Sequence, residues 1–154
     1  MKRVLLTGMS GTGKSTVIEE LRRRGYNAVD MDEPGWSEYA PDGDWIWCEE
    51  RLHERLAMED GTILFVSGCA QNQVKFHPQF DSIILFSAPA AVLIERLTTR
   101  TNNPYGKHPD ELAATLSYLE TVEPLLRRVA SHEIDTSLPL EHVLAELLHI
   151  ANIE

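Results

Sequence analysis

Eight residues near the beginning of the chain have the types and spacing that bind the phosphates of a nucleotide. Residues 8–15 read GMSGTGKS, which fits the pattern G-x-x-x-x-G-K-[ST]. Glycines at these points let backbone N–H groups turn inward around an anion, in conformations that a Cβ atom would obstruct. We expect Lys14 to reach the β- and γ-phosphates of ATP and the Ser15 hydroxyl to ligate Mg²⁺. The residues expected to hold ATP in this loop are Gly8, Gly11, Thr12, Gly13, Lys14, Ser15 and Thr16.

The segments on both sides of this loop favour phosphate binding over an ordinary glycine turn that only caps a helix. Residues 3–7 contain an apolar run, which predicts a strand buried on both faces, as in a parallel sheet. Residues 14–24 place Val17, Ile18 and Leu21 on one face at helical spacing. A helix that begins at the loop directs its positive end at bound phosphates. Strand, loop and helix therefore follow one another in the order that the motif requires.

Two carboxylates follow the next predicted strand, residues 28–32. Asp30 and Asp32 are two positions apart, so in an extended strand they face the same side. Beside a magnesium–phosphate site, one carboxylate can hold a metal-bound water, and we assign this role to Asp30. The other can orient an acceptor hydroxyl and take its proton, and we assign this role to Asp32. The alternative is a solvated acidic strand end without a chemical role.

Predicted strands alternate with predicted helices along the whole chain, which indicates a parallel, doubly wound α/β sheet. We therefore predict the α/β fold class and a single domain over residues 1–154, with a loop at 34–44 and a proline at 124 that should kink or split the long helix. The strands are expected at residues 3–7, 28–32, 63–66, 82–86 and 132–135. The helices are expected at residues 14–24 and 45–60 and as segments beginning near residues 89, 110 and 137.

Composition excludes several classes of protein. The 154 residues carry a formal net charge of −10, which argues against a broad nucleic-acid footprint, since such a surface needs clustered Lys and Arg. We find no apolar stretch of membrane-spanning length and no signal peptide, so we expect a cytoplasmic protein without a membrane or nucleic-acid partner. Cys48 and Cys69 provide neither a disulfide framework nor a metal-binding spacing. The oligomeric state is left open.

Two missing motifs narrow the chemistry. A motor or switch ATPase carries an aspartate at the end of the apolar strand beside its phosphate loop, whereas the strand at 63–66 is followed by Ser67 and Gly68. A GTPase would carry an Asn-Lys-x-Asp guanine-binding motif, and the chain has none. Both absences favour phosphoryl transfer to a small acceptor.

These features together resemble the small P-loop kinases of the nucleoside monophosphate kinase superfamily, nearest to the shikimate and gluconate kinase branch, over nearly the whole chain. The resemblance implies an AAA-type ATP-binding domain with a three-layer α/β/α P-loop fold, a five-stranded parallel sheet and a short lid. In that branch an Asp-x-Asp acts at Mg²⁺ and at the acceptor hydroxyl, which Asp30 and Asp32 match. An Arg-x-x-Glu binds substrate, which implies that role for Arg51. A glycine-rich turn touches the acceptor, and here it retains one glycine, Gly68, instead of three.

The resemblance also implies a lid at about residues 100–109 that brings an arginine to the transferring phosphate. Arg100 is our choice for this cation, with Arg96 and Lys107 as secondary candidates, because positive charge there stabilises the equatorial oxygens. The alternative is a solvated helix end. The turn at Thr136 is similar to the loop on the adenine side of the superfamily, so we expect Thr136 and Arg96 to contact ATP.

The resulting hypothesis is an ATP- and Mg²⁺-dependent kinase that phosphorylates a small metabolite, with Lys14, Asp32 and Arg100 as its catalytic residues. One alternative is a nucleoside or nucleotide kinase, since the aromatic residues between positions 36 and 47 favour a base while Arg51 favours an anion. The other is an ATP-binding regulatory module without phosphotransfer, which the single-glycine turn and the atypical lid would suit.

Overall fold

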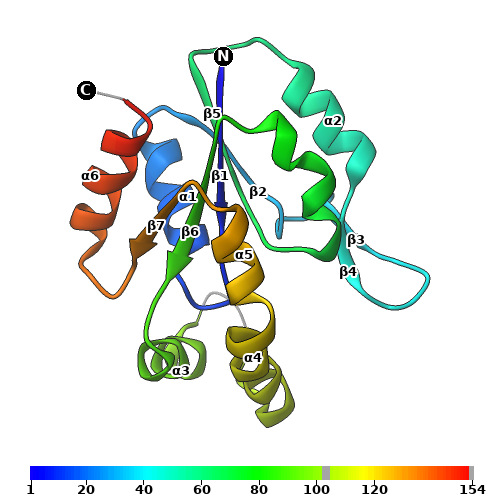
Figure 1. Ribbon diagram of the computed structural model, residues 1–154, viewed down its shortest axis with the longest axis vertical. Coiled ribbons are helices and arrows are strands. Elements are labelled where there is room, and N and C mark those ends of the chain that lie inside the picture. The colour runs from blue at the N-terminus through cyan, green and yellow to red at the C-terminus, as the bar shows by residue number, and fades with distance from the viewer. Residues whose placement is uncertain (102–104, 153–154) are drawn as a thin grey trace.

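The computed structural model describes residues 1–101 and 105–152. Within these residues five parallel strands form one sheet in the order β2-β5-β1-β6-β7, so β1 lies at its centre (Figure 1). This confirms the predicted α/β class and five-stranded parallel sheet, with every strand within a few residues of its expected place. The strands of this sheet are β1 (Lys2–Thr7), β2 (Asn27–Asp30), β5 (Ile63–Ser67), β6 (Ser82–Ser87) and β7 (His132–Asp135).

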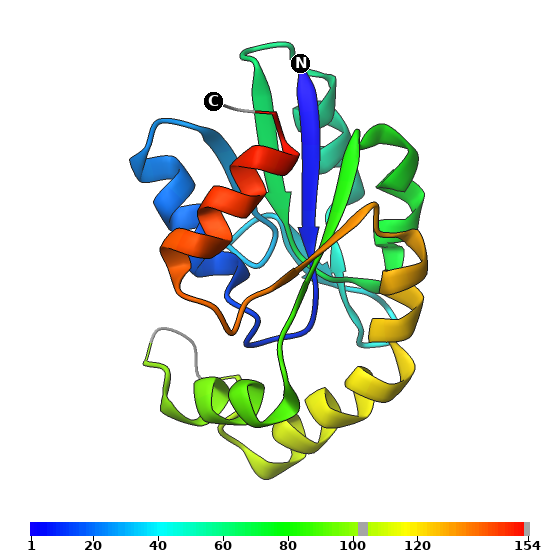
Figure 2. The same cartoon turned by 60° about the vertical axis from the view of Figure 1, so that its left-hand side comes forward.

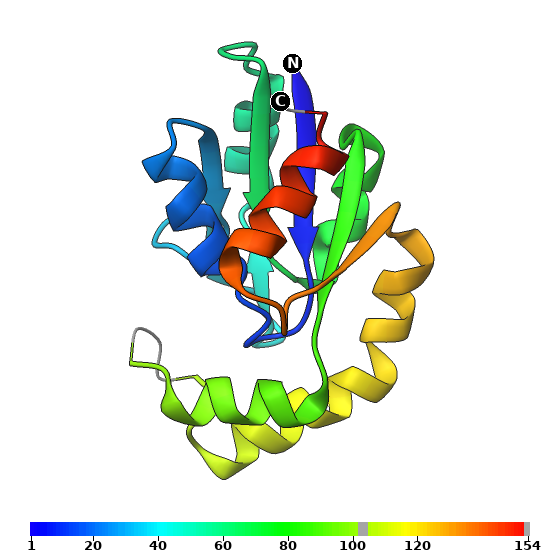
Figure 3. The same cartoon turned by 90° about the vertical axis from the view of Figure 1, so that its left-hand side faces the viewer.

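Helices cover both faces of the sheet and complete the three predicted layers. Helices α1 and α6 pack on one face, and α2, the 3₁₀ helix η1 and α5 lie on the other (Figure 2). Helices α3 and α4 lie beyond the carboxyl ends of the strands (Figure 3). The helices are α1 (Lys14–Arg23), α2 (Glu49–Ala57), η1 (Gln71–Gln79), α3 (Ala90–Thr99), α4 (Pro109–Thr121), α5 (Glu123–Val129) and α6 (Leu140–Ile150).

Alternate side chains of each central strand enter opposite halves of the core. In β5, Ile63 and Phe65 pack toward α1 and α6, whereas Leu64 and Val66 pack toward α2. All four are buried, which is why the strand reads as a continuous apolar run. Burying each such side chain contributes about 1.5–3 kcal/mol, so the two faces together fix the register of the sheet.

The segment between β2 and α2 differs from the prediction. Instead of a loop at 34–44 and a helix from 45, the chain forms an antiparallel hairpin of β3 (Ser37–Tyr39) and β4 (Trp45–Trp47), and α2 begins only at Glu49. The turn contains Asp42-Gly43, and the Asp42 carboxylate accepts a hydrogen bond from the Asp44 N–H at 3.0 Å. An Asp-Gly pair flanked by aromatic residues is a hairpin signal, and it outweighs the helical spacing that the prediction followed.

The 3₁₀ helix η1 was not anticipated, and it holds this hairpin in place. The Asn72 side chain accepts a hydrogen bond from the Trp47 N–H at 3.0 Å and donates one to the Trp47 carbonyl, also at 3.0 Å. Asn72 also donates to the Glu49 carboxylate at the start of α2. A single buried amide therefore satisfies both backbone groups of Trp47, as a neighbouring strand would.

The carboxyl-terminal half follows the predicted order. The long helix expected from residue 110 is divided into α4 and α5 next to Pro124, because proline supplies no N–H and clashes with the preceding turn. Residues 102–104 of the expected lid lie outside the described residues. No helix in the described part of the chain is both long and apolar enough to cross a bilayer.

Replacing Asn72 with alanine should destabilise the protein by roughly 2–4 kcal/mol, because the N–H and carbonyl of Trp47 would be left buried without partners. Urea unfolding of the two proteins measures the difference. Asn27→Ala is the control, since Asn27 makes one exposed hydrogen bond, and it should change stability by no more than about 0.5 kcal/mol. Equal stability of Asn72→Ala and the parent would contradict this account of the hairpin.

Candidate active site

The loop between β1 and α1 is shaped by glycines whose backbones pass close to their neighbours. Gly8 has φ +149°, and a Cβ atom placed on it would lie 2.3 Å from the Phe86 carbonyl oxygen at the end of β6. Gly13 caps α1 in the left-handed conformation, with φ +90°. The Thr12 hydroxyl closes the loop by donating to the Met9 carbonyl at 2.7 Å. The loop therefore has the geometry that the sequence motif predicts.

Lys14 lies at the centre of this loop and is partly buried. Its ammonium donates to the carbonyls of Gly8 at 2.6 Å and Met9 at 3.0 Å. Burial lowers the pKa of Lys14, while the nearby Cys69 and Asp32 oppose this shift. A cation held by neutral carbonyls inside an anion-binding loop is available to a phosphate, which offers it a charged partner instead.

Ser15 and Asp30 meet directly beside the loop. The Ser15 hydroxyl, in the first turn of α1, donates to the Asp30 carboxylate at 2.6 Å, and Asp30 is only 7% exposed. The second oxygen of Asp30 accepts a hydrogen bond from the Asp32 backbone N–H at 2.9 Å. The structure thus brings together the two residues that the sequence assigned to the metal, and hydroxyl and carboxylate oxygens are ligands that suit Mg²⁺.

The sequence analysis placed Asp32 within the second strand. In the structure β2 ends at Asp30, and Asp32 lies two residues beyond it. Its carboxylate lies in the wall of the cavity, near the charges of Lys14, Asp30 and Arg100. Desolvation by the surrounding protein raises the pKa of Asp32, the Lys14 ammonium lowers it, and Asp30 raises it further. The Trp45 indole of β4 lies near the same carboxylate and lowers its pKa by favouring the charged form. Sequence reasoning missed this contact because it missed the hairpin.

Arg100 reaches the site from the end of α3. Its backbone N–H donates to the Arg96 carbonyl, and its guanidinium donates to the Tyr105 carbonyl at 2.6 Å. Burial lowers the pKa of Arg100, whereas the Asp32 charge raises it, so the guanidinium and this carboxylate are near enough to interact. Lys107, the other lid candidate, donates to the Thr98 carbonyl on α3.

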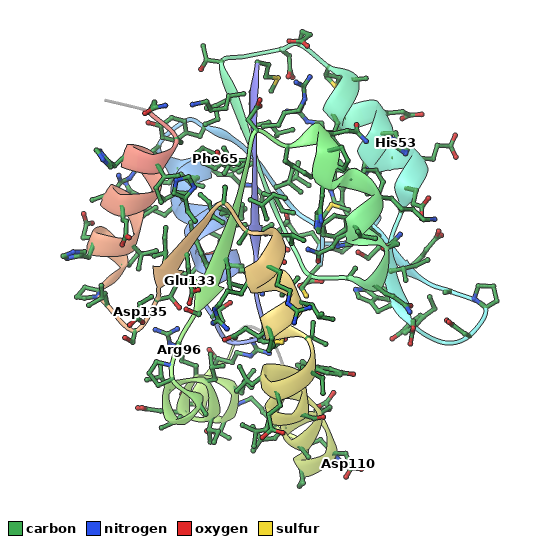
Figure 4. All side chains as sticks on the ribbon, in the orientation of Figure 1. His53, Phe65, Arg96, Asp110, Glu133 and Asp135 are labelled. Atoms are coloured by element: carbon green, nitrogen blue, oxygen red, sulfur yellow. The ribbon has the colours of Figure 1, made fainter. Side chains whose placement is uncertain are left out.

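Arg96 ties α3 to the phosphate loop and to the end of β7. Its guanidinium donates to the Gly11 carbonyl at 3.2 Å and to both the hydroxyl and the carbonyl of Thr136. Figure 4 shows Arg96 on α3, below Asp135 at the carboxyl end of β7. Thr136 is buried and bonded to the Ser87 carbonyl, so its position is fixed by β6.

These residues surround one cavity of about 550 Å³. It is lined by most of the predicted nucleotide- and metal-binding residues, with Asp32, Arg96 and Arg100 on its walls. Two exposed leucines, Leu138 and Leu140, add an apolar wall beside Thr136 that the sequence analysis did not identify. The sequence feature that could have identified them is a pair of leucines at the start of a helix, just after the carboxyl end of a predicted strand. The predicted residues in the lining are Gly11, Thr12, Gly13, Lys14, Ser15, Thr16, Asp30, Asp32, Arg96, Arg100 and Thr136.

Two predicted acceptor-binding residues lie outside this lining. The Arg51 guanidinium on α2 is stacked 4.0 Å above the Trp36 ring. Gly68 is buried, and a Cβ atom there would lie 3.0 Å from both Met31 and the Trp47 indole. The structure therefore gives Gly68 a packing contact with the hairpin and gives Arg51 an aromatic partner.

Comparison with known proteins extends these observations. The family described as AAA domain matches residues 4–117. Shikimate kinase 2 of Yersinia enterocolitica is 28% identical over 96% of this chain and 94% of its own length. A putative adenylate kinase of Archaeoglobus fulgidus is 32% identical over 92% of this chain and 77% of its own length. The crystal structure of shikimate kinase from Bacteroides thetaiotaomicron superposes with a TM-score of 0.70 over 99% of both chains, and at 20% identity this likeness shows the fold alone.

Gly8→Ala should destabilise the nucleotide-free protein by roughly 3 kcal/mol or more, because the new methyl group cannot avoid the Phe86 carbonyl at a positive φ. Gly13→Ala is the matched control. It has a similar backbone strain but no atom within 4 Å of the new Cβ, so it should cost only about 1–2 kcal/mol. Thermal and urea unfolding measure both values, and equal losses would show that the contact with Phe86 is unimportant.

Proposed function

The chain belongs to the AAA domain family, among the phosphate-loop kinases related to the nucleoside monophosphate kinases, and we propose that it transfers the γ-phosphoryl group of ATP to a small metabolite. It is an ATP-dependent phosphotransferase, as its relatives over most of its length are. One observation carries the choice of acceptor site: Asp32 opens into the same cavity as the phosphate loop and faces both Lys14 and Arg100.

We propose that the loop amides and Lys14 bind the phosphates of ATP. The Lys14 ammonium would exchange the carbonyls of Gly8 and Met9 for phosphate oxygens, which are stronger acceptors because they are charged. The apolar wall of Leu138 and Leu140 would lie against the adenine ring, next to the backbone that Arg96 fixes. The positive end of α1 adds to the attraction for the phosphates.

Mg²⁺ would be held by the Ser15 hydroxyl and, through water, by the Asp30 carboxylate. The donors fit this ion, because Mg²⁺ takes oxygen ligands, keeps several waters and is usually bound through one or two protein groups together with phosphates. When bound, Mg²⁺ would neutralise part of the negative charge on the phosphates.

Asp32 would orient the acceptor hydroxyl and take its proton as the new bond to phosphorus forms. Desolvation raises the pKa of Asp32, which makes its carboxylate a stronger base, while Lys14, the Trp45 indole and Arg100 act in the opposite direction and favour the charged form. Arg100 would leave the Tyr105 carbonyl and bind the transferring group, where its charge stabilises the equatorial oxygens. The residues thus divide into those that hold ATP and those that act on the acceptor.

A nucleotide acceptor is the second candidate, and the hairpin favours it. Tyr39 and Trp45 form a cross-strand pair with ring centroids 4.8 Å apart, and they remain 75% and 44% exposed. An exposed aromatic pair beside the proposed base is suited to stacking a planar ring. A hydroxylated carboxylic acid such as shikimate or gluconate would depend instead on a cation such as Arg51. From the composition, we also propose a cytoplasmic location and no nucleic-acid or membrane partner.

Replacing Asp32 with asparagine should lower phosphotransfer by roughly 100-fold or more, because it removes the base, while changing ATP affinity by less than about threefold. Lys14→Ala should weaken ATP binding and turnover together, since it removes a charged phosphate contact. Coupled ADP-release assays over a panel of acceptors, together with calorimetric titration of ATP, measure both properties. Asp110→Asn, on the exposed start of α4 (Figure 4), is the control and should match the parent. An active Asp32→Asn protein would exclude Asp32 as the base.

The two acceptor classes can be separated by paired variants. If the acceptor is a nucleotide, Trp45→Leu should raise its KM roughly tenfold by removing the stacking surface, with a smaller effect from Arg51→Ala. If it is a hydroxylated carboxylic acid, the order of the two effects should reverse. The assay uses nucleoside monophosphates, nucleosides, shikimate and gluconate as acceptors, and Tyr118→Leu on α4 is the control for loss of an exposed aromatic residue.

A further inference from the structure

Asp32 belongs to a short turn between β2 and β3, residues 31–37, which we call the Asp32 turn. At its start, the Met31 N–H donates to the Ser67 carbonyl of β5 at 2.9 Å. At its end, the Ser37 hydroxyl donates back to the Met31 carbonyl at 2.5 Å. Both ends of the turn are therefore fixed, so the position of Asp32 depends on what holds the residues between them.

Two arginines from different helices contact the middle of the Asp32 turn. Arg22 of α1 donates to both carboxylate oxygens of Glu33, at 3.1 and 2.5 Å. Arg51 of α2 stacks its guanidinium 4.0 Å above the Trp36 ring. The Trp36 N–H donates to the Glu33 carbonyl at 3.2 Å, which joins the two points of contact. The middle of the turn is therefore connected to α1 through Glu33 and to α2 through Trp36.

The backbone beside Trp36 leaves space for the Arg51 side chain. Gly35 has φ +89°, and a Cβ atom placed on it would lie 2.3 Å from Nη1 of Arg51. The guanidinium therefore lies close to the Gly35 backbone as well as over the Trp36 ring. Because a guanidinium is planar and positively charged, it stacks favourably on the face of an indole. Contact with two consecutive residues restrains the backbone of the turn.

Arg51 lies outside the cavity in which the reaction is proposed to occur. Asp32 and Glu33 line the cavity that contains the phosphate loop, whereas Arg51 is not part of its lining. The family resemblance implies that Arg51 binds the acceptor. Its observed contacts connect it instead to the turn that carries the proposed base.

We propose that Arg51 is a positioning residue, which acts through Trp36 by holding the Asp32 turn in place and does not bind the acceptor. This inference rests on the proposed function, in which Asp32 is the base. A base must lie within hydrogen-bond distance of the hydroxyl whose proton it takes, so a looser turn lowers the rate of transfer. Affinity for the acceptor would depend little on Arg51.

The proposal predicts the same kinetic effect from loss of either stacking partner. Arg51→Ala and Trp36→Leu should each lower kcat roughly three- to tenfold and change the KM of the acceptor by less than about twofold. The double variant should be no worse than either single variant, because only one contact is lost. Trp36→Phe keeps an aromatic face under the guanidinium and should retain most of the activity. The assay is coupled ADP release with nucleoside monophosphates, nucleosides, shikimate and gluconate.

Hydrogen exchange followed by mass spectrometry tests the turn itself, without an acceptor. The amides of Glu33 and Trp36 are hydrogen-bonded within the turn. Peptides covering residues 31–37 should therefore exchange roughly fivefold faster in Arg51→Ala than in the parent. Arg55→Ala is the matched control, since Arg55 lies on the same helix and donates to Asp60 at 3.1 Å. It should leave both kcat and the exchange of the turn unchanged.

Three outcomes would overturn the proposal. Unchanged exchange in Arg51→Ala would mean that Arg51 does not hold the turn. A higher KM confined to shikimate or gluconate, seen in Arg51→Ala but not in Trp36→Leu, would mean that Arg51 binds the acceptor. Additive losses in the double variant would mean that the two residues act separately. The assignment of Asp32 as the base fails separately, if Asp32→Asn is as active as the parent while the turn still responds to Arg51→Ala.

Discussion

The parallel pairing of β1 with β5 and β6 is the constraint on which the site depends. This pairing brings the carboxyl ends of the strands to one edge of the sheet, where the phosphate loop leaves β1. The approach of Gly8 to the Phe86 carbonyl is possible only without a side chain, so the packing of the loop against the end of β6 requires a glycine there. Phosphate-binding geometry is therefore a consequence of sheet packing, with the core on both faces holding the strands in register.

Charge compensation within the cavity is the second organising feature. Lys14 loses hydration, which lowers its pKa, and Asp32 is desolvated, which raises its pKa, yet each stabilises the charged form of the other. Arg100 adds a cation from α3, and its Tyr105 carbonyl partner is a neutral group that a phosphate can replace. In the function that we propose, these cations would bind the triphosphate and the carboxylate would act on its acceptor.

The acceptor side differs from what the family resemblance implies. The hairpin of β3 and β4 places Trp45 against Asp32 and buries Trp47 against Gly68, while Arg51 stacks on Trp36. Bulky aromatic side chains thus occupy the region where the resemblance implied an arginine and a glycine-rich turn. This is the part of the molecule in which we place the selectivity for the acceptor, because the phosphate side follows a common pattern.

The sequence by itself determined the α/β class, the five-stranded sheet and the phosphate loop, because these depend on local patterns: apolar runs, helical spacing and glycines at fixed positions. It also selected Asp30 and Asp32, since the end of a parallel strand is where such sheets bind ligands. Only the tertiary structure decided which groups surround them. The hydrogen bonds between Asn72 and Trp47 and the position of the Trp45 indole near Asp32 depend on contacts between distant segments. Spacing along the chain carries no record of such contacts, because packing in three dimensions creates them.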